Sequence, residues 1–174
     1  MPPAKAEAST MTKTPSKTQI RLAQVVIALM IAFVTLGVAW YGVSAEVRER
    51  IWRNLLDRPG GPMTFRFILQ PIMATIAALY DGVEDARAGR SPYLWTIFAD
   101  STERGGRLWE GLISTARVLL LALVMDVIYQ YIVFDTFHPG ETVIVALLLA
   151  FVPYLLLRGP IERIARMWVG DPAR

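Results

Sequence analysis

The sequence LAQVVIALMIAFVTLGVAW, residues 22–40, decides the fold class of this chain. It carries no charged side chain over about the 20 residues that a helix needs to cross the hydrocarbon core of a bilayer. Lys17 and Arg21 precede it, and Trp40 and Tyr41 stand at its far end, where aromatic side chains prefer the membrane–water boundary. The stretch therefore predicts a transmembrane α-helix at about residues 20–43.

A cleaved signal peptide is the alternative for this stretch, because residues 43–45 (VSA) resemble a cleavage site that follows a basic tail. The apolar region of a signal peptide is typically about 7–15 residues long, and residues 22–40 exceed it. We therefore expect the span to be retained. Residues 1–18 lack apolar periodicity and are rich in Ala, Ser, Thr, Pro and Lys, so they predict a disordered cytoplasmic tail.

Three more apolar blocks predict transmembrane helices at about residues 64–80, 112–134 and 142–158. Residues 19–174 are then expected to form a single membrane domain, an all-α integral membrane helical bundle with about four spans. The block at residues 64–80 is short and polar for a span, since it contains Arg66, Gln70 and Pro71. A re-entrant or half-buried helix is the alternative there.

Two segments have the pattern of helices that lie on a membrane surface. In residues 44–57 the apolar side chains, including Val47 and Ile51, recur on one helical face while arginines occupy the rest. After a break predicted at residues 158–160, residues 160–169 place apolar side chains at the spacing i, i+3, i+4, i+7. Both segments predict amphipathic interfacial helices.

The basic residues predict the orientation, because cytoplasmic segments of membrane proteins carry an excess of Lys and Arg. The turn at residues 135–141 has neither, whereas the connection at residues 81–111 and the C-terminal tail are basic. Four spans therefore place both the N- and the C-terminus on the cytoplasmic side of a bacterial inner membrane. This topology leaves arginines in the first external loop, and a three-span alternative avoids them but exports the basic N-terminal tail.

Composition excludes several kinds of site. The chain has no cysteine and one histidine, so disulfides, thiolate metal sites, cysteine nucleophiles and a multi-histidine metal site within one chain are excluded. The sequence has no visible nucleophile–base pair, phosphate-binding loop or cofactor motif, and we expect no enzyme activity, no cofactor and no resident metal. Apolar spans interrupt the basic residues, which argues against nucleic acid as a partner.

Polar side chains inside the predicted spans are the main candidates for a site, since an ionisable group in hydrocarbon costs about 2.5–3.5 kcal/mol even on lenient scales. Arg66 and Gln70 lie four residues apart in the second span, and Asp126 and Gln130 lie four apart in the third, at matching depth. We expect them to form an intramembrane polar cluster near a tyrosine hydroxyl. Its role is a structural lock, a proton or ion site at Asp126, or a contact with another subunit.

Arginines at the predicted cytoplasmic face suit the phosphates of anionic lipid headgroups. One of them, Arg117, lies at the inner end of the third span, from where a long side chain reaches the headgroups. The predicted lipid-contacting residues are Arg87, Arg90, Arg104, Arg107, Arg117, Arg163 and Arg166.

Short motifs are spread over about residues 64–163: RFILQP at 66–71, DG at 81–82, DA at 85–86, GR at 89–90, PY at 92–93, DVIYQ at 126–130, PGE at 139–141, PY at 153–154 and RGP at 158–160. In this pattern the chain resembles small bacterial multi-pass inner-membrane proteins of uncharacterised function. The resemblance implies a multi-pass membrane protein and supplies no activity.

Two classes of function stay open. The first is a non-catalytic accessory or scaffold component of a membrane assembly, which short loops, surface helices and small-residue helix faces favour. The second is a small oligomeric channel or transporter that uses a polar cluster of Asp126 and Arg66. The accessory function predicts a dry, paired Asp126, whereas transport predicts one that water reaches. The expected partners are anionic membrane lipid and a membrane protein or a second copy of the chain.

Overall fold

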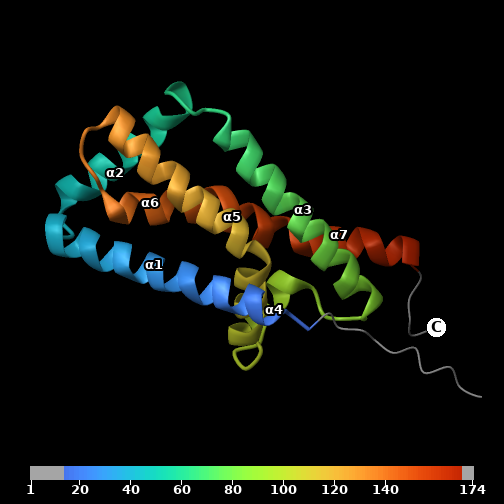
Figure 1. Cartoon of the computed structure of the whole chain (residues 1–174). Coiled ribbons are helices and arrows are strands. Elements are labelled where there is room, and N and C mark those ends of the chain that lie inside the picture. Colours follow the sequence, from blue (N-terminus) through green and yellow to red (C-terminus); the bar gives the residue numbers. More distant parts are fainter. Residues whose placement is uncertain (1–13, 170–174) are drawn as a thin grey trace, which may run out of the picture.

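The computed structural model describes residues 14–169, and every regular element in that range is a helix. Figure 1 shows long helical passes that run in alternating directions. The first three passes are α1 (Lys17–Tyr41), α3 (Arg66–Arg87) and α5 (Arg104–Val133). The fourth consists of α6 (Pro139–Ala146), the π-helical segment η2 (Leu147–Phe151) and α7 (Val152–Val169). The prediction of an all-α helical bundle is confirmed.

Shorter elements connect the passes at the two ends of the bundle (Figure 1). At one end, which we call the α2 end, α2 (Ala45–Asp57) and the 3-10 helix η1 (Arg58–Gly60) link α1 to α3. At the opposite end, the α4 end, α4 (Tyr93–Ala99) links α3 to α5. The start of α1 and the end of α7 both lie toward the α4 end (Figure 1).

Three of the passes are long and apolar enough to cross a membrane, namely Lys17–Tyr41, Arg104–Val133 and Pro139–Trp168. α3 does not meet these criteria, since ionisable side chains lie at both of its ends. The structure therefore supports membrane association through three helices. A fourth span at residues 64–80 stays a prediction.

The first helix begins earlier than expected because its first turn is capped. Ser16 Oγ accepts a hydrogen bond from Gln19 N–H at 3.2 Å, and Gln19 Oε1 accepts one from Ser16 N–H at 2.8 Å, which forms a capping box. α1 thus starts at Lys17, inside the segment 1–18 that was predicted to be a disordered tail. Residues 1–13 of that segment lie outside the described residues.

α3 also runs past the boundary expected at residue 80 and ends at Arg87. The reason is electrostatic, since the acidic residues in this last part of the helix have partners on α7. Asp81 and Asp85 both lie within ion-pair distance of Arg158. The polar residues that follow the predicted span therefore continue the helix and do not form a surface connection.

The break predicted at residues 158–160 does not occur, because α7 runs without interruption from Val152 to Val169. The interfacial helix expected at residues 160–169 is accordingly the last part of α7, which corrects the sequence analysis. Two prolines lie inside this final pass, at positions 153 and 160, and each removes a backbone hydrogen bond.

Local packing explains how the helix tolerates both prolines. Before Pro153, η2 forms a wider turn in which Val152 N–H bonds to the Leu147 carbonyl, five residues back. Around Pro160, α3 packs so closely that a Cβ placed on Gly82 would lie 2.8 Å from Ile161 Cγ2. Tertiary contact thus holds the helix where the local sequence rule predicts an end.

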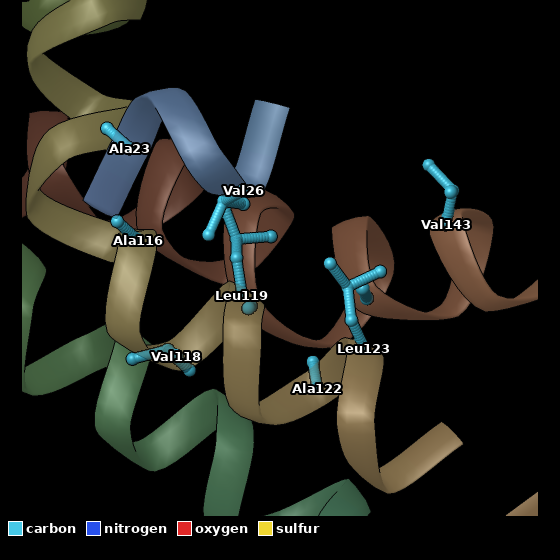
Figure 2. Close-up of a cluster of buried hydrophobic side chains, with 10 residues drawn as sticks. Ala23, Val26, Ala116, Val118, Leu119, Ala122, Leu123 and Val143 are labelled. Atoms are coloured by element: carbon cyan, nitrogen blue, oxygen red, sulfur yellow. The ribbon is translucent and has the colours of Figure 1, made fainter. Parts of the chain in front are cut away.

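Small residues bring the helices together in the main core. Figure 2 shows Ala23 and Val26 of α1 beside Ala116 and Leu119 of α5. These side chains are nearly or wholly buried, and α5 continues the contact with Leu123 toward α6. Small side chains permit the close helix approach that drives association in lipid.

Candidate functional site

A buried polar cluster at the α2 end draws side chains from η1, α3, α5 and α6. Asp126 Oδ1 accepts hydrogen bonds from Arg58 Nη1 at 2.6 Å and from Arg66 Nη1 at 3.0 Å. Asp126 Oδ2 accepts one from Gln130 Nε2 at 2.8 Å. We call this the Asp126 cluster, and its members, each at most 3% exposed, are Arg58, Arg66, Asp126, Gln130 and Glu141.

Arg58 links the two carboxylates of the cluster, because its Nη2 also donates to Glu141 Oε2 at 3.2 Å. Asn54 Nδ2 lies 3.2 and 3.0 Å from the two Glu141 oxygens, and Arg50 Nε lies 3.4 Å from Oε1. The two arginines of the cluster balance its two carboxylates, and Arg50 at the rim adds one net positive charge. Arg50 and Asn54 belong to α2, so this helix contributes one positive and one polar side chain to the rim of the cluster.

The Gln130 amide ties the end of α5 to the start of α6. Its Oε1 accepts the His138 N–H at 2.6 Å, and its Nε2 donates to Thr142 Oγ1 at 2.9 Å. The His138 ring stacks on Tyr41, with ring centroids 4.8 Å apart. Burial lowers the pKa of His138 below 6.5, so the imidazole adds no charge to the cluster at neutral pH.

Aromatic rings cover the guanidinium groups of the cluster. The centre of the Tyr129 ring lies 4.4 Å from Arg66 Cζ and 5.3 Å from Arg58 Cζ, within the range of cation–π attraction. Phe134 lies 5.8 Å from Arg58 Cζ on the same side of α5. These rings exclude water and so strengthen the ion pairs beneath them.

The structure brings together three of the four side chains expected in the intramembrane polar cluster, namely Arg66, Asp126 and Gln130. Gln70 is buried one turn further along α3, and its Oε1 has no hydrogen-bond partner among the described residues. Arg66 Nε and Nη2 also lack one there. The tyrosine that joins the cluster is Tyr129, which contributes its ring face.

Sequence reasoning missed Arg58 and Glu141, which lie outside the apolar blocks. Arg58 precedes the proline–glycine turn at residues 59–62, a context typical of an exposed loop, yet it is 0% exposed. Glu141 lies in the turn predicted at residues 135–141, yet it is the second carboxylate of the cluster. A usable signal was present, since Glu141 directly follows Pro139 and Gly140 at a helix start, where a carboxylate is favoured.

A second buried network, the Asp85 cluster, lies at the α4 end. Arg158 Nε donates to Asp85 Oδ2 at 2.8 Å, and Arg107 Nη1 donates to Asp85 Oδ1 at 3.2 Å. Arg90 Nη1 lies 3.2 Å from the same Oδ1 and donates to Glu110 Oε1 at 2.9 Å. Three helices are joined in this way, with Asp85 on α3, Arg107 and Glu110 on α5, and Arg158 on α7.

Two tyrosines extend the Asp85 cluster. Arg158 Nη1 donates to the Tyr154 hydroxyl at 2.5 Å, and that hydroxyl donates to Asp81 Oδ2 at 2.6 Å. The Tyr93 hydroxyl donates to the Arg107 carbonyl at 2.6 Å, and the centre of its ring lies 4.2 Å from Arg158 Cζ. Burial raises the pKa of Tyr93 to about 12, so its hydroxyl stays protonated and remains a donor.

Two arginines predicted to contact lipid headgroups belong to this internal network. Arg107 is 8% exposed and is bound by Asp85 and Glu110, and Arg90 shares the same two carboxylates. Their guanidinium groups thus neutralise buried acids at the α4 end. The sequence places these residues in the predicted basic connection at 81–111, where no pairing of arginines with acids was visible.

The other five predicted lipid-contacting arginines have more open surroundings. Arg104 donates through Nε to the Ile97 carbonyl at 2.6 Å, and Arg166 pairs with the buried Glu162. The remaining three are exposed, and they are Arg87, Arg117 and Arg163. Headgroup contact stays a prediction for this set.

Both clusters consist of buried ion pairs that join different helices. Each central carboxylate accepts several charge-assisted hydrogen bonds, and this arrangement holds helices in register instead of presenting a free base or nucleophile. Comparison with known proteins adds nothing further, since no family model, curated protein or solved structure matches the chain.

Proposed function

We propose that this chain is a non-catalytic accessory or scaffold component of a bacterial inner-membrane assembly. The observation that carries the proposal is the state of Asp126, which is 0% exposed and has both oxygens bonded to Arg58, Arg66 and Gln130. A carboxylate that binds and releases protons or ions needs access to water. One that is buried and saturated fixes helix positions, as a scaffold requires.

The proposed topology has four spans, with both termini in the cytoplasm and the α2 end outside. The main objection is the arginines of the first external loop, three of which have carboxylate partners in the folded chain. Arg58 is buried against Asp126 and Glu141, Arg50 lies on Glu141, and Arg53 pairs with Glu49 at 3.0 Å. In the folded chain carboxylates thus neutralise these arginines, whereas orientation follows the number of Lys and Arg residues, to which acids contribute little.

A small oligomeric channel or transporter is the second candidate, and one observation favours it. Arg66 Nε, Arg66 Nη2 and Gln70 Oε1 are buried polar atoms that lack hydrogen-bond partners among the described residues. Buried polar groups ordinarily have a partner, and water often supplies it. Water at Arg66 and Gln70 would bring solvent into the Asp126 cluster itself, because Arg66 binds Asp126 directly.

The two functions are separated by purification of the tagged chain from its host in mild detergent, followed by native mass determination and proton and ion flux in liposomes. We expect a stoichiometric membrane-protein partner and no flux above that of empty liposomes. Asp126→Asn should leave flux unchanged, and Glu49→Gln in an exposed ion pair serves as its control. A homo-oligomer whose flux falls with Asp126→Asn but not with Glu49→Gln would establish the transporter.

A further inference from the structure

A groove of about 370 Å³ lies at the α2 end, between α1, the α1–α2 turn, α2 and the final pass. Its volume falls within the roughly 300–1,000 Å³ of small-molecule sites. Three segments supply its apolar walls: Val34 and Val38 on α1, Val47 and Ile51 on α2, and Val143, Ile144 and Leu147 on the final pass.

Close contact between two glycines closes one side of this groove. A Cβ placed on Gly37 of α1 would lie 2.8 Å from the backbone nitrogen of Gly140 and 3.1 Å from its Cα. The backbones of α1 and α6 therefore touch, and α2 supplies a further wall of the groove. The groove is thus a built feature of the helix packing that extends along α1 from Val34 to Tyr41.

The polar rim of the groove is positive. Arg48 and Arg50 line it together with Glu141 and His138. Glu141 is already neutralised by Arg58, and Arg50 uses only Nε to reach it. Arg48 is exposed, and its guanidinium makes no hydrogen bond or ion pair with the described residues. Two guanidinium groups at one end of an apolar groove match an anionic headgroup at one end of an acyl chain.

Tryptophans place the groove at the expected depth of lipid phosphates. Trp40 at the end of α1 is 59% exposed, and Trp52 on α2 is 63% exposed. Such residues gather at the membrane–water boundary, where an amphipathic helix also lies. The groove extends from this level along α1 toward the apolar middle of the bundle.

We propose that this groove binds a membrane phospholipid with an anionic headgroup, with one acyl chain along the apolar walls and the phosphate at Arg48 and Arg50. The proposal rests on the membrane placement proposed above and is separate from the lipid contacts predicted at the α4 end. It goes beyond a general attraction of arginine to lipid, because it assigns a defined site with a stoichiometry of one.

The test is native mass spectrometry of the full chain released from mild detergent with added phosphatidylglycerol or phosphatidylcholine. We expect one phospholipid to remain bound, with phosphatidylglycerol preferred. Val38→Trp fills the groove and should reduce the bound fraction about tenfold. Val25→Trp, at a 52% exposed position of the same helix outside the groove, is the matched control and should bind as the unmodified chain does.

The headgroup is tested at the rim. Arg48→Gln should weaken phosphatidylglycerol binding about fivefold and phosphatidylcholine binding less, because the choline cation already offsets the attraction of its phosphate to arginine. Arg53→Gln, on the same helix but paired with Glu49 and outside the groove, should change neither.

Three outcomes overturn the proposal: no retained phospholipid, equal binding by Val38→Trp and Val25→Trp, or a photo-crosslinker at position 38 that captures a polypeptide instead of lipid. The membrane placement is checked separately by alkaline carbonate extraction. A chain that stays in the membrane pellet but retains no lipid rejects the groove site alone. A chain that is extracted rejects the membrane placement as well.

Discussion

Asp126 Oδ1 lies 2.6 Å from Arg58 Nη1 and 3.0 Å from Arg66 Nη1. No other buried carboxylate of the described residues lies as close to either arginine, since Glu141 is 3.2 Å from Arg58. Removing Asp126 leaves Arg58 and Arg66 together in a site that is at most 1% exposed. We predict that Asp126→Ala lowers the free energy of unfolding by about 3–5 kcal/mol, the cost of breaking a buried ion pair from one side. Unfolding of the detergent-solubilised protein by titration with a denaturing detergent measures it.

Glu49→Ala provides the comparison at an exposed ion pair. Glu49 and Arg53 are 3.0 Å apart, but their side chains are 73% and 69% exposed. Loss of such a pair costs below about 1 kcal/mol. Equal losses for Asp126→Ala and Glu49→Ala would contradict the view that burial makes the Asp126 cluster a structural lock.

Sequence alone could find part of this site. Arg66, Asp126 and Gln130 lie in apolar blocks, where the cost of an unpaired polar group predicts that they meet. Arg58 carried no such signal, because a residue beside a proline–glycine turn is ordinarily solvated. Its burial depends on how η1 packs against α5 and α6, which is a tertiary property.

At the scale of elements, one face of α3 shows how the helix both packs and carries charge. Positions 66, 70, 74, 78, 82 and 86 recur every fourth residue, and all are buried. This buried face begins with the polar Arg66 and Gln70 and continues with Ala74 and Ala78. It ends next to the buried Asp85. The four-residue spacing of this face is visible in the sequence, but the helix that packs against it is not. In the structure, α7 makes most of the helix contacts of α3.

Gly82 is the tightest point of this contact. A Cβ at position 82 would lie 3.0 Å from the Arg158 carbonyl oxygen, a backbone atom that cannot rotate away. We predict that Gly82→Ala costs about 1–3 kcal/mol through overpacking, although alanine favours helices. Detergent-induced unfolding of the purified variant measures the loss.

Gly159→Ala on the facing helix is the control, since a Cβ at position 159 would meet nothing within 4 Å. This change should be neutral or should stabilise the protein by up to about 1 kcal/mol, as glycine-to-alanine changes inside helices do. A loss at position 159 as large as that at position 82 would show that helix propensity, and not the α3–α7 contact, decides the result.

At the scale of the whole molecule, two charged clusters lie at opposite ends of the bundle and apolar packing lies between them. The Asp126 cluster joins η1, α3, α5 and α6, and the Asp85 cluster joins α3, α5 and α7. α1 takes part in neither core ion-pair set, and only 11% of its most apolar window is buried. Of the three candidate membrane-spanning passes, α1 therefore has the most surface left for lipid or a partner.

The topology of the chain depends on whether α3 crosses the membrane. If α3 crosses the membrane, the α2 end lies outside and α4 lies in the cytoplasm. In the three-span alternative, residues 42–111 stay together in the cytoplasm. The chain contains no cysteine, so single introduced cysteines report their location without background.

We predict that Glu46→Cys on α2 reacts with an impermeant maleimide added outside intact spheroplasts, whereas Ser101→Cys after α4 reacts only once the membrane is permeabilised. Both positions are exposed in the structure, so lack of labelling reports the side of the membrane and not burial. Equal protection of both cysteines would mean that α3 does not cross. It would also separate Arg48 from the turn at residues 135–141 by the membrane, and so would reject both the proposed lipid groove and the contact of Arg58 with Glu141.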